Sequence, residues 1–273
     1  MYTKRFTAYF LASFFLFLLL PFMAKANITI IGSLAHERNV ETDKTYQGVI
    51  LIRNTEQEPQ EVKIYQTDYL FFSDGKNIYG TPAGKDPRSN ALWIVFSPSR
   101  LTIPAKATYP LSYTIKVPDD KTMKGTFWSM LMIEPIPKNS PEAVAPEQEK
   151  VNTTITQIIR YGFQIITHIG DTGKRELKFV DTQLLKEQEK RILQVDIENV
   201  GERQLKPQVW VEIYDKETFM GKFEGGITGI YPSASTRYHL DLSGMPEGEY
   251  KALVLADCGG DDVFGCTYTL KLK

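Results

Sequence analysis

The chain has 273 residues, with 32 basic and 33 acidic side chains and a formal net charge of −1. This balance gives no sign of nucleic-acid binding, which requires a basic surface. After the first 26 residues there is no apolar run long enough to cross a bilayer, so we expect no stable membrane insertion of the mature protein.

The N-terminus has the features of a secretory signal peptide. Lys4 and Arg5 precede an apolar run from Phe6 to Met23, and Ala24-Lys25-Ala26 fits the small-x-small cleavage pattern. The sequence therefore predicts a signal peptide over 1–26, a mature chain from Asn27, and a periplasmic or secreted location. The alternative is an uncleaved membrane anchor, because the run approaches the length of a spanning helix.

The mature chain is mildly acidic. Removing the signal peptide takes away three basic residues and no acid, which leaves 29 basic against 33 acidic side chains, or −4. The residue directly after the cleavage site is Asn27 and not the cysteine that a lipoprotein would need. We expect a soluble exported protein.

Two segments repeat one pattern in different residues. They are "TYQGVILIRNTEQEPQEVKIYQTDY" (Thr45 to Tyr69) and "RILQVDIENVGERQLKPQVWVEIYD" (Arg191 to Asp215). Each reads as a strand, an asparagine (Asn54 or Asn199), a polar turn and a second strand. Short alternating strands with turn signals at this spacing predict an all-β chain with two tandem immunoglobulin-like β-sandwich domains, over 27–171 and 172–273.

Alternation assigns the faces of the strands in the second domain. Leu193, Val195 and Ile197 are expected to point inward, and Trp210 falls on the outer face. An outward tryptophan is a candidate contact residue, and the alternative is that it packs under a neighbouring loop or against the first domain.

The segment over 135–152, "PIPKNSPEAVAPEQEKVN", has almost nothing to bury and is predicted to be a mobile loop. It leads into "TTITQIIRYGFQIITHIG" (Thr153 to Gly170), whose odd positions are mostly apolar. This alternation predicts the closing strand of the first domain, with Phe163 and Ile165 in the core. The even face and the N-terminal half are less constrained, and a strand tied down at one end can accept a partner strand along its edge.

The two cysteines, Cys258 and Cys266, flank the Gly-rich turn "GGDDVFG". In an oxidising compartment such a pair predicts a disulfide across a hairpin. A metal pair is the alternative, but two further ligands at suitable spacing are not in sight.

Few residues carry recognisable chemistry. The three histidines, His36, His168 and His239, are widely separated, and neither a G-x-S-x-G nor an H-E-x-x-H motif occurs. The stretch "GTPAGKD" (Gly80 to Asp86) is one residue short of a phosphate-binding loop and is interpreted as a solvated turn. We expect no catalytic residues, no metal and no cofactor, and an enzyme is the weakest hypothesis.

The first domain resembles known proteins through its hairpin "VILIRNTEQEPQEVKIYQ", the run "WIVFSPSRLTIPAKATYPLSYTIKVP", the strand "GTFWSMLMIEPIP", and the long loop leading to an alternating strand with Arg160. Over most of residues 28–170 this pattern resembles the N-terminal domain of periplasmic pilus chaperones and the extracytoplasmic immunoglobulin-like domains of the WxL-interacting type. The second domain is similar only as a sandwich.

The resemblance implies a mechanism. In usher-pathway chaperones the last strand of the first domain lends alternating apolar side chains to an unfinished pilus subunit. An Arg and a Lys in the cleft between the domains hold the carboxylate at the C-terminus of the subunit. Here Arg160 lies on the matching strand and Arg38 follows the first one, but Gly162 stands where a lysine would be expected.

The leading hypothesis is therefore an exported, chaperone-like protein-binding module that caps or assembles a pilus-type or surface protein by strand addition. The alternative is a structural envelope protein that binds cell-wall glycan or a surface partner through outer-face aromatic residues such as Trp210, Tyr69 and Phe71. The predicted partner-binding residues are Ile155, Ile158, Ile159, Arg160, Arg38 and Trp210.

Overall fold

The computed structural model describes residues 27–138, 140, 142–143, 158–187 and 190–272, and this part of the chain is built almost entirely of strands. The predicted signal peptide lies outside the described residues. The elements of the first half are β1 (Ile28–Ile31), β2 (Ala35–Val40), β3 (Thr45–Asn54), β4 (Gln60–Phe71), β5 (Asn77–Gly80), the short 3-10 helix η1 (Ala91–Trp93), β6 (Ile94–Phe96), β7 (Arg100–Ile103), β8 (Thr108–Lys116), β9 (Gly125–Pro135) and β10 (Tyr161–Ile169). Those of the second half are β11 (Leu177–Glu187), β12 (Lys190–Asn199), β13 (Gln208–Asp215), β14 (Thr218–Ile227), β15 (Ser235–Asp241), β16 (Gly248–Asp257) and β17 (Val263–Leu272).

The strands β1 to β10 form a sandwich of two sheets. One sheet has the order β1-β3-β8-β6, and the other has the order β2-β10-β9-β4-β5, with β7 also paired to β4. The first strand of the chain is divided between the two sheets, because β1 pairs with β3 and β2 pairs in parallel with β10. The change of sheet follows Gly32, whose φ of +94° is a conformation that suits glycine.

The strands β11 to β17 form the second sandwich, with sheets in the orders β11-β12-β15 and β14-β13-β16-β17. Leu193, Val195 and Ile197 of β12 point into its core as the alternation predicts, and each is fully buried. The predicted all-β fold of two tandem immunoglobulin-like sandwiches is thus confirmed.

The asparagine of each sequence repeat is buried and has the same structural role in both sandwiches. The Asn54 side chain donates to the carbonyls of Glu58 and Ile103, and its oxygen accepts the N–H of Glu56. Asn199 makes the equivalent hydrogen bonds in the second sandwich. Its side-chain oxygen accepts the N–H of Gly201, two residues later, and its side-chain amide donates to the Arg203 and Ile230 carbonyls. Each asparagine ties the polar turn after its strand to a distant loop, and hydrogen bonding of this kind is what makes a buried amide tolerable.

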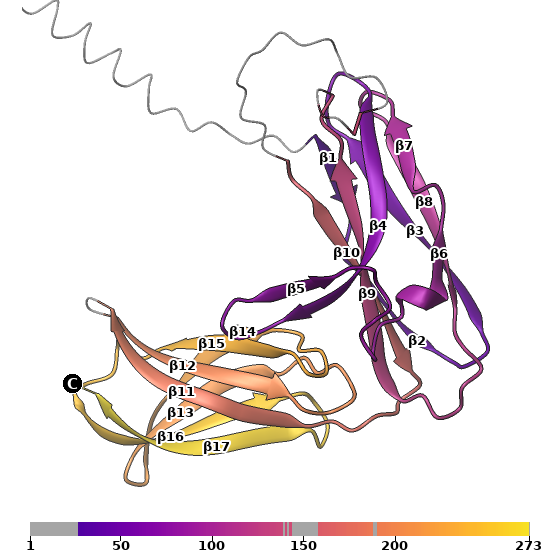
Figure 1. Cartoon of the computed structure of the whole chain (residues 1–273). Helices are drawn as coiled ribbons and strands as arrows, with labels where there is room; N and C mark the ends of the chain where they lie inside the picture. The colour runs from indigo at the N-terminus through magenta and orange to yellow at the C-terminus, as the bar shows by residue number, and fades with distance from the viewer. Residues whose placement is uncertain (1–26, 139, 141, 144–157, 188–189, 273) are drawn as a thin grey trace, which may run out of the picture.

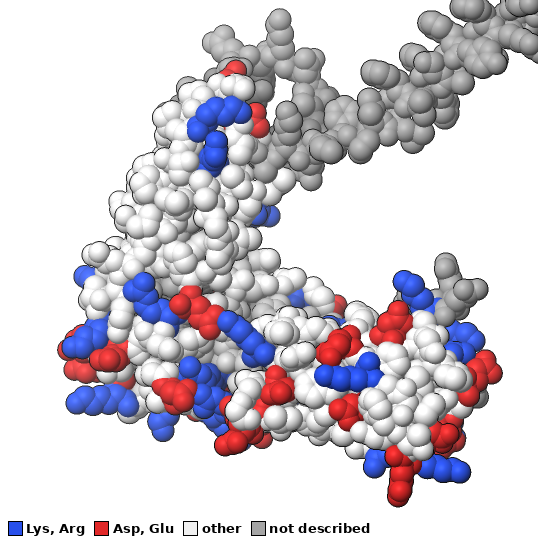
Figure 2. All heavy atoms as spheres, turned by 180° about the vertical axis from the view of Figure 1, so that it is seen from behind, with Lys and Arg blue, Asp and Glu red and all other residues white. Residues whose placement is uncertain are grey.

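The two sandwiches meet at an elbow, and β10 runs along the inner side of the first arm (Figure 1). Seen from behind, the first arm is nearly free of charged side chains between its tip and the elbow, whereas the elbow and the second arm carry both signs (Figure 2).

An aromatic contact holds the elbow. The Trp128 ring of β9 stacks on the Tyr231 ring of the second sandwich, with centroids 4.5 Å apart and planes 4° from parallel. The Trp128 indole N–H donates to the Tyr69 carbonyl at 2.6 Å, and Phe71 meets Tyr231 edge to face. Trp128 and Ile166 of the first sandwich therefore belong to the core cluster of the second.

This contact involves Tyr69 and Phe71, two of the outer-face aromatic residues that the glycan-binding alternative needs as ligand contacts. Both lie on the part of β4 that reaches the second sandwich, and both pack against its core cluster. The two side chains do lie on the outer face of the strand, as predicted, but there they pack against the second sandwich.

The first residues of the segment over 135–152, predicted to be a mobile loop, make fixed contacts. Pro135 ends β9, and the Ile136 side chain is buried, with its carbonyl accepting the Gln60 amide. The Glu142 carboxylate pairs with Lys63 at 2.6 Å. These contacts fix the first residues of the segment, and residues 144–157 lie outside the described part.

The structure contradicts the predicted disulfide, since Cys258 and Cys266 are both free thiols. Cys266 lies opposite Val254 in the β16–β17 register, four residues before Cys258. At about 3.3 Å per strand residue this offset is about 13 Å, well beyond the span of about 7 Å that a disulfide can bridge. Burial raises the pKa of the Cys258 thiol to about 11.

Candidate partner-binding face

The two halves of the β10 region have different neighbours. β9 pairs antiparallel with β10 from Tyr161 to Ile169, but β2 covers the other edge only from Gln164 onward. Over 158–163 no described strand lies beside that edge. The inner side of the first arm therefore carries a short stretch of open strand edge, which we call the free edge.

The side chains of this region alternate as predicted on one face. Phe163 and Ile165 are each 1% exposed and belong to the core of the first sandwich. Ile158 is 42% exposed and Ile159 is half-buried. Ile155, the remaining isoleucine of the predicted set, lies outside the described residues.

The even face is not the unconstrained surface that the sequence suggested. Ile166 is buried in the contact with the second sandwich, and His168 is buried beside it. The Gln164 side chain is hydrogen-bonded to the Tyr231 hydroxyl. The half-buried Gln164 has its partner across the elbow, and the buried His168 has hydrogen-bond partners within the first sandwich, so a polar sequence pattern here did not mean exposure.

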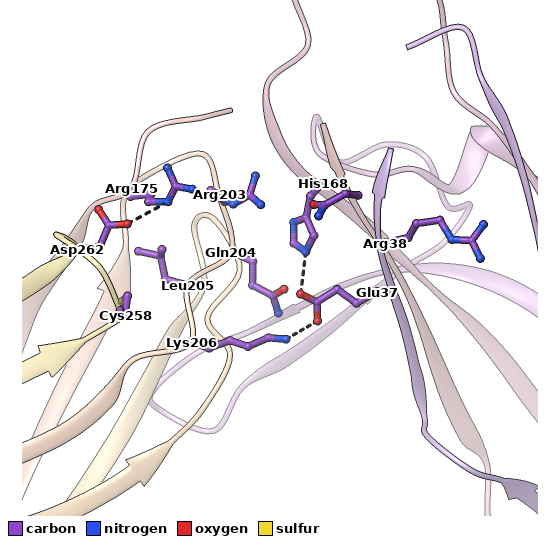
Figure 3. A pocket seen from close by; sticks show the side chains of 12 residues that line it. Glu37, Arg38, His168, Arg175, Arg203, Gln204, Leu205, Lys206, Cys258 and Asp262 are labelled. Carbon is purple, nitrogen blue, oxygen red and sulfur yellow. Dashed lines mark hydrogen bonds and ion pairs between the residues drawn. The ribbon is translucent and has the colours of Figure 1, made fainter. Parts of the chain in front are cut away.

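Arg160 and Arg38, the two candidate anchors for a carboxylate, are not brought together. The Arg160 guanidinium lies 3.8 Å from the Glu134 carboxylate, at the free edge. The Arg38 guanidinium sits 5.4 Å from the centroid of the Tyr46 ring and points away from the cleft between the sandwiches (Figure 3). The arrangement that the resemblance implied, two cations converging in the cleft, is therefore not formed by these residues.

Trp210 lies on the outer face of β13, as predicted. The Lys222 ammonium stands 4.2 Å from its ring centroid, and its indole N–H donates to the Glu212 carboxylate at 3.2 Å. These contacts cover part of the ring and reduce the area available to a ligand.

The cleft instead contains a hydrogen-bonded chain that sequence reasoning missed (Figure 3). His168 Nε2 lies 2.9 Å from a Glu37 oxygen, and the other Glu37 oxygen pairs with Lys206 of the second sandwich. His168 Nδ1 lies 2.8 Å from the Thr126 hydroxyl, which accepts the N–H of Gln204 at 2.8 Å. The only sequence signal was a histidine within an apolar strand.

The chain is complete when His168 is neutral. Its Nε2–H then donates to Glu37, while Nδ1 accepts from Thr126. Burial lowers the pKa of His168, against the opposing effect of the Glu37 carboxylate. For Glu37, burial acts to raise the pKa, but hydrogen bonds from Lys206 and His168 outweigh it and lower the pKa.

The cleft wall beside this chain has mixed charge. A cavity of about 590 Å³ is lined by Glu37, Arg175, Arg203, Lys206 and Asp262, among others. The Arg175 guanidinium pairs with Asp262 at 3.1 Å. Within the described residues no three His, Cys, Asp or Glu side chains are grouped as a metal site would need, and no helix is long and apolar enough to cross a membrane.

No known family model matches the chain, and no curated protein resembles it in sequence. Several solved structures are similar to the chain. A chain of the chaperone–tip adhesin complex of CFA/I fimbriae biogenesis is 14% identical, with a TM-score of 0.47, over 89% of this chain and 98% of that one. For the class 5 fimbriae chaperone CfaA the identity is 13% and the TM-score 0.46, over 88% and 98%.

A chain of the Salmonella enterica complex between the SafA pilin and the SafB chaperone is 13% identical, with a TM-score of 0.43, over 91% of this chain and 98% of that one. Pilus chaperones are thus among the proteins similar to this chain in fold. At such identities the likeness concerns the fold alone, and we base the function on the geometry of this chain.

Proposed function

We propose that this protein is an exported, non-catalytic, chaperone-like module that binds a pilus-type or other surface protein by adding one of its strands to the free edge. The observation that carries the proposal is the incomplete cover of β10: β2 pairs with it only from Gln164 onward, and no strand of the described residues pairs with this edge over 158–163.

The backbone supports the proposal. The N–H of Gln164 donates to the Leu34 carbonyl at 2.8 Å, on the β2 side. Because N–H groups alternate along a strand, those of Gly162 and Arg160 face the same side, where no described strand accepts them. A partner strand laid there would add hydrogen bonds worth about 0.5–1.5 kcal/mol each.

The side chains support it too. An open strand edge is normally protected by a cover, a bulge or charges, because it pairs readily with other chains. Here the exposed Ile158 stands next to the edge, and Arg160 is the only charged side chain over 158–163. The free edge continues directly from residues 164–169, which are held between β2 and β9, so a partner strand would meet a strand that is anchored at one end.

The glycan-binding alternative is left with less support. Two of its three aromatic residues, Tyr69 and Phe71, pack at the elbow, and Trp210 is partly covered.

Site-specific photocrosslinking in the native host tests strand addition. A photoreactive amino acid at position 158 or 160 should capture one partner polypeptide, with the two positions mapping to neighbouring residues of one extended segment. Ile227 is 66% exposed on the second sandwich and serves as the control position. Crosslinks that scatter over unrelated proteins, or that appear equally at 227, would contradict the proposal.

A backbone variant sharpens this test. Arg160→Pro removes an N–H from the free edge, whereas Arg160→Ala removes the same side chain and keeps the N–H. We expect the proline variant to lose the crosslink from position 158 and the alanine variant to keep it. Equal loss in both would assign binding to the Arg160 side chain and overturn the strand-addition mechanism.

A further inference from the structure

The outer strands of the second sandwich differ in how their open edges are protected. Its two sheets end in β11, β15, β14 and β17. The register of β11 shifts between Phe179 and Asp181, and β14 pairs with β13 through two such shifts. β15 carries Arg237 and Asp241. Bulges and charges of this kind keep the edge of a sheet from pairing with another chain.

β17 has no such protection. Its residues, Val263 to Leu272, pair with β16 in an unbroken register, and Lys271 is the only charged side chain of the strand. β17 runs along the lower side of the second arm in Figure 1, and no described strand pairs with its outer side. We call this outer side the β17 edge.

The backbone of β17 presents hydrogen-bonding groups to this edge. Across the turn before the strand, the N–H of Cys258 donates to the Asp262 carbonyl at 2.9 Å. Because hydrogen-bonded and non-hydrogen-bonded pairs alternate in an antiparallel ladder, the even-numbered residues of β17 bond to β16. The N–H and C=O groups of Gly265, Thr267 and Thr269 therefore point to the open side.

The same side of the sandwich leaves apolar side chains partly exposed. β11, which belongs to the other sheet, contacts β17 there. Val254 and Ala256 of β16 are fully buried, but the residues beside them in the register, Cys266 and Phe264, are only half-buried. The half-buried apolar side chains of β11 and β17 that pack on this core are Phe179, Leu184, Phe264, Cys266 and Tyr268, which we call the apolar seam.

We propose that the β17 edge is the contact of a symmetric dimer, in which β17 of a second copy of this chain pairs with it antiparallel. The sheet then continues from one copy into the other. A two-fold axis through the middle of the strand brings the two Thr267 residues together and places Gly265 of one copy opposite Thr269 of the other. Lys271 then lies opposite Val263, so no like charges oppose each other.

The apolar seam favours a second copy over a single added strand as the occupant. A two-fold axis sets the seam of each copy against that of the other, whereas one added strand would cover the β17 edge alone. Nine strand residues and two sheets about 10 Å apart give a side of about 30 Å by about 20 Å, or about 600 Å² per copy. The dimer would bury about 1,200 Å², the lower end of the range for stable interfaces.

Sedimentation equilibrium of the mature chain, with a thiol reductant present, tests the dimer. Between about 1 and 100 µM we expect a reversible monomer–dimer equilibrium, because the contact is at the lower end of that range. A monomer at all these concentrations would overturn the proposal. So would a dimer that the reductant removes, because it would be a disulfide product of the free thiols.

Two variants at one position test the backbone pairing. Thr267→Pro removes an N–H from the β17 edge, and the fold should tolerate it because that N–H faces outward. Thr267→Ala removes the same side chain and keeps the N–H. The dimer dissociation constant should rise about 10- to 100-fold in the proline variant, which loses two hydrogen bonds per dimer, and change little in the alanine variant. An equal change in both would overturn the edge pairing.

A charge exchange tests the two-fold axis and needs no backbone change. The Thr267 side chain is exposed, so Thr267→Lys and Thr267→Glu should both fold like the wild type. Each variant alone should dimerise more weakly than the wild type, because like charges meet near the axis, and a mixture of the two should form mixed dimers preferentially. No preference for the mixed dimer would overturn the proposed axis.

The dimer is separable from the proposed function, because β17 and the free edge belong to different sandwiches. Arg160→Pro alters the free edge and distinguishes the two open edges. A dimer that survives Arg160→Pro and is weakened by Thr267→Pro supports the β17 contact, whatever the crosslinks from position 158 show. A dimer lost in Arg160→Pro and kept in Thr267→Pro would place the contact at the free edge and overturn the proposal.

Discussion

The two halves of the β10 region differ in what surrounds them. Residues 164–169 have a strand on each edge, the core of the first sandwich on one face and the second sandwich on the other. Within the part of the chain that the structure describes, residues 158–163 have a strand on one edge at most, and Ile158 is exposed. The difference shows how one strand can be a rigid part of the fold at one end and an open template at the other.

The anchored half also explains why the elbow is held. Its odd residues serve the first core, while Ile166 and His168 serve the contact with the second sandwich. Local stability follows burial and hydrogen bonding, so we expect amide exchange to be slow over 164–169 and faster before it.

The largest expected effect comes from placing a charge in each half. Ile165→Asp buries a carboxylate in the first core and should cost about 4 kcal/mol or more, enough to unfold the domain. Ile158→Asp should change the free energy of unfolding by no more than about 0.5 kcal/mol, because its side chain faces solvent. Urea unfolding of both variants makes the comparison. A similar loss in both would show that the free half is part of the core.

The next effect separates the two faces of the anchored half. Ile166→Ala should cost about 2–5 kcal/mol, the usual range for a buried isoleucine, and should act on the contact between the sandwiches. Ile165→Ala is the control, with a similar cost confined to the first core. Thermal unfolding followed by calorimetry should show the transitions of the two sandwiches moving apart only in Ile166→Ala. A cost below about 1 kcal/mol would mean that this face is not a packed contact.

The smallest effect is the pH dependence at His168. Its pKa in the folded protein is lowered by burial, so the unfolded chain binds this proton more tightly. The stabilisation by neutral His168 is therefore complete above the unfolded pKa of about 6.5 and decreases as the pH falls below it, by at most about 1.4 kcal/mol per pH unit. Burial also lowers the pKa of His36, which adds an effect of the same sign.

The variant His168→Gln isolates the contribution of His168. Unfolding free energies of wild type and variant between pH 7.5 and 5.5 should show a weaker pH dependence in the variant. The lowered pKa of Glu37 acts in a separate window, since its contribution is present above the ordinary glutamate pKa and is lost only below it. An equal pH dependence of the unfolding free energy in wild type and variant would show that His168 does not contribute to it.

Parts of the candidate site were visible in the sequence because they depend on neighbours along the chain. The alternation around Phe163 and Ile165 predicted a core face, and the open edge was predicted for the half preceding it. The disulfide prediction failed for a related reason: closeness in sequence placed Cys258 and Cys266 in one hairpin, but the register of β16 and β17 separates them along the strands.

Other parts were hidden because they depend on residues far apart in the sequence. Glu37 and His168 are 131 positions apart, and neither residue by itself indicates that the two form a pair. The groove lined by Tyr65, Met130 and Gly162 likewise needs three strands in register, and neither Met130 nor Gly162 indicates it alone.

By itself the sequence determined the all-β fold, the two sandwiches and the inward face of their strands, because a period of two and turn residues are local properties of the chain. Only the tertiary structure decided which edge β2 leaves open and which outer face packs against the second sandwich. Those features depend on which distant strands become neighbours, and strand pairing across long loops leaves no local period in the sequence.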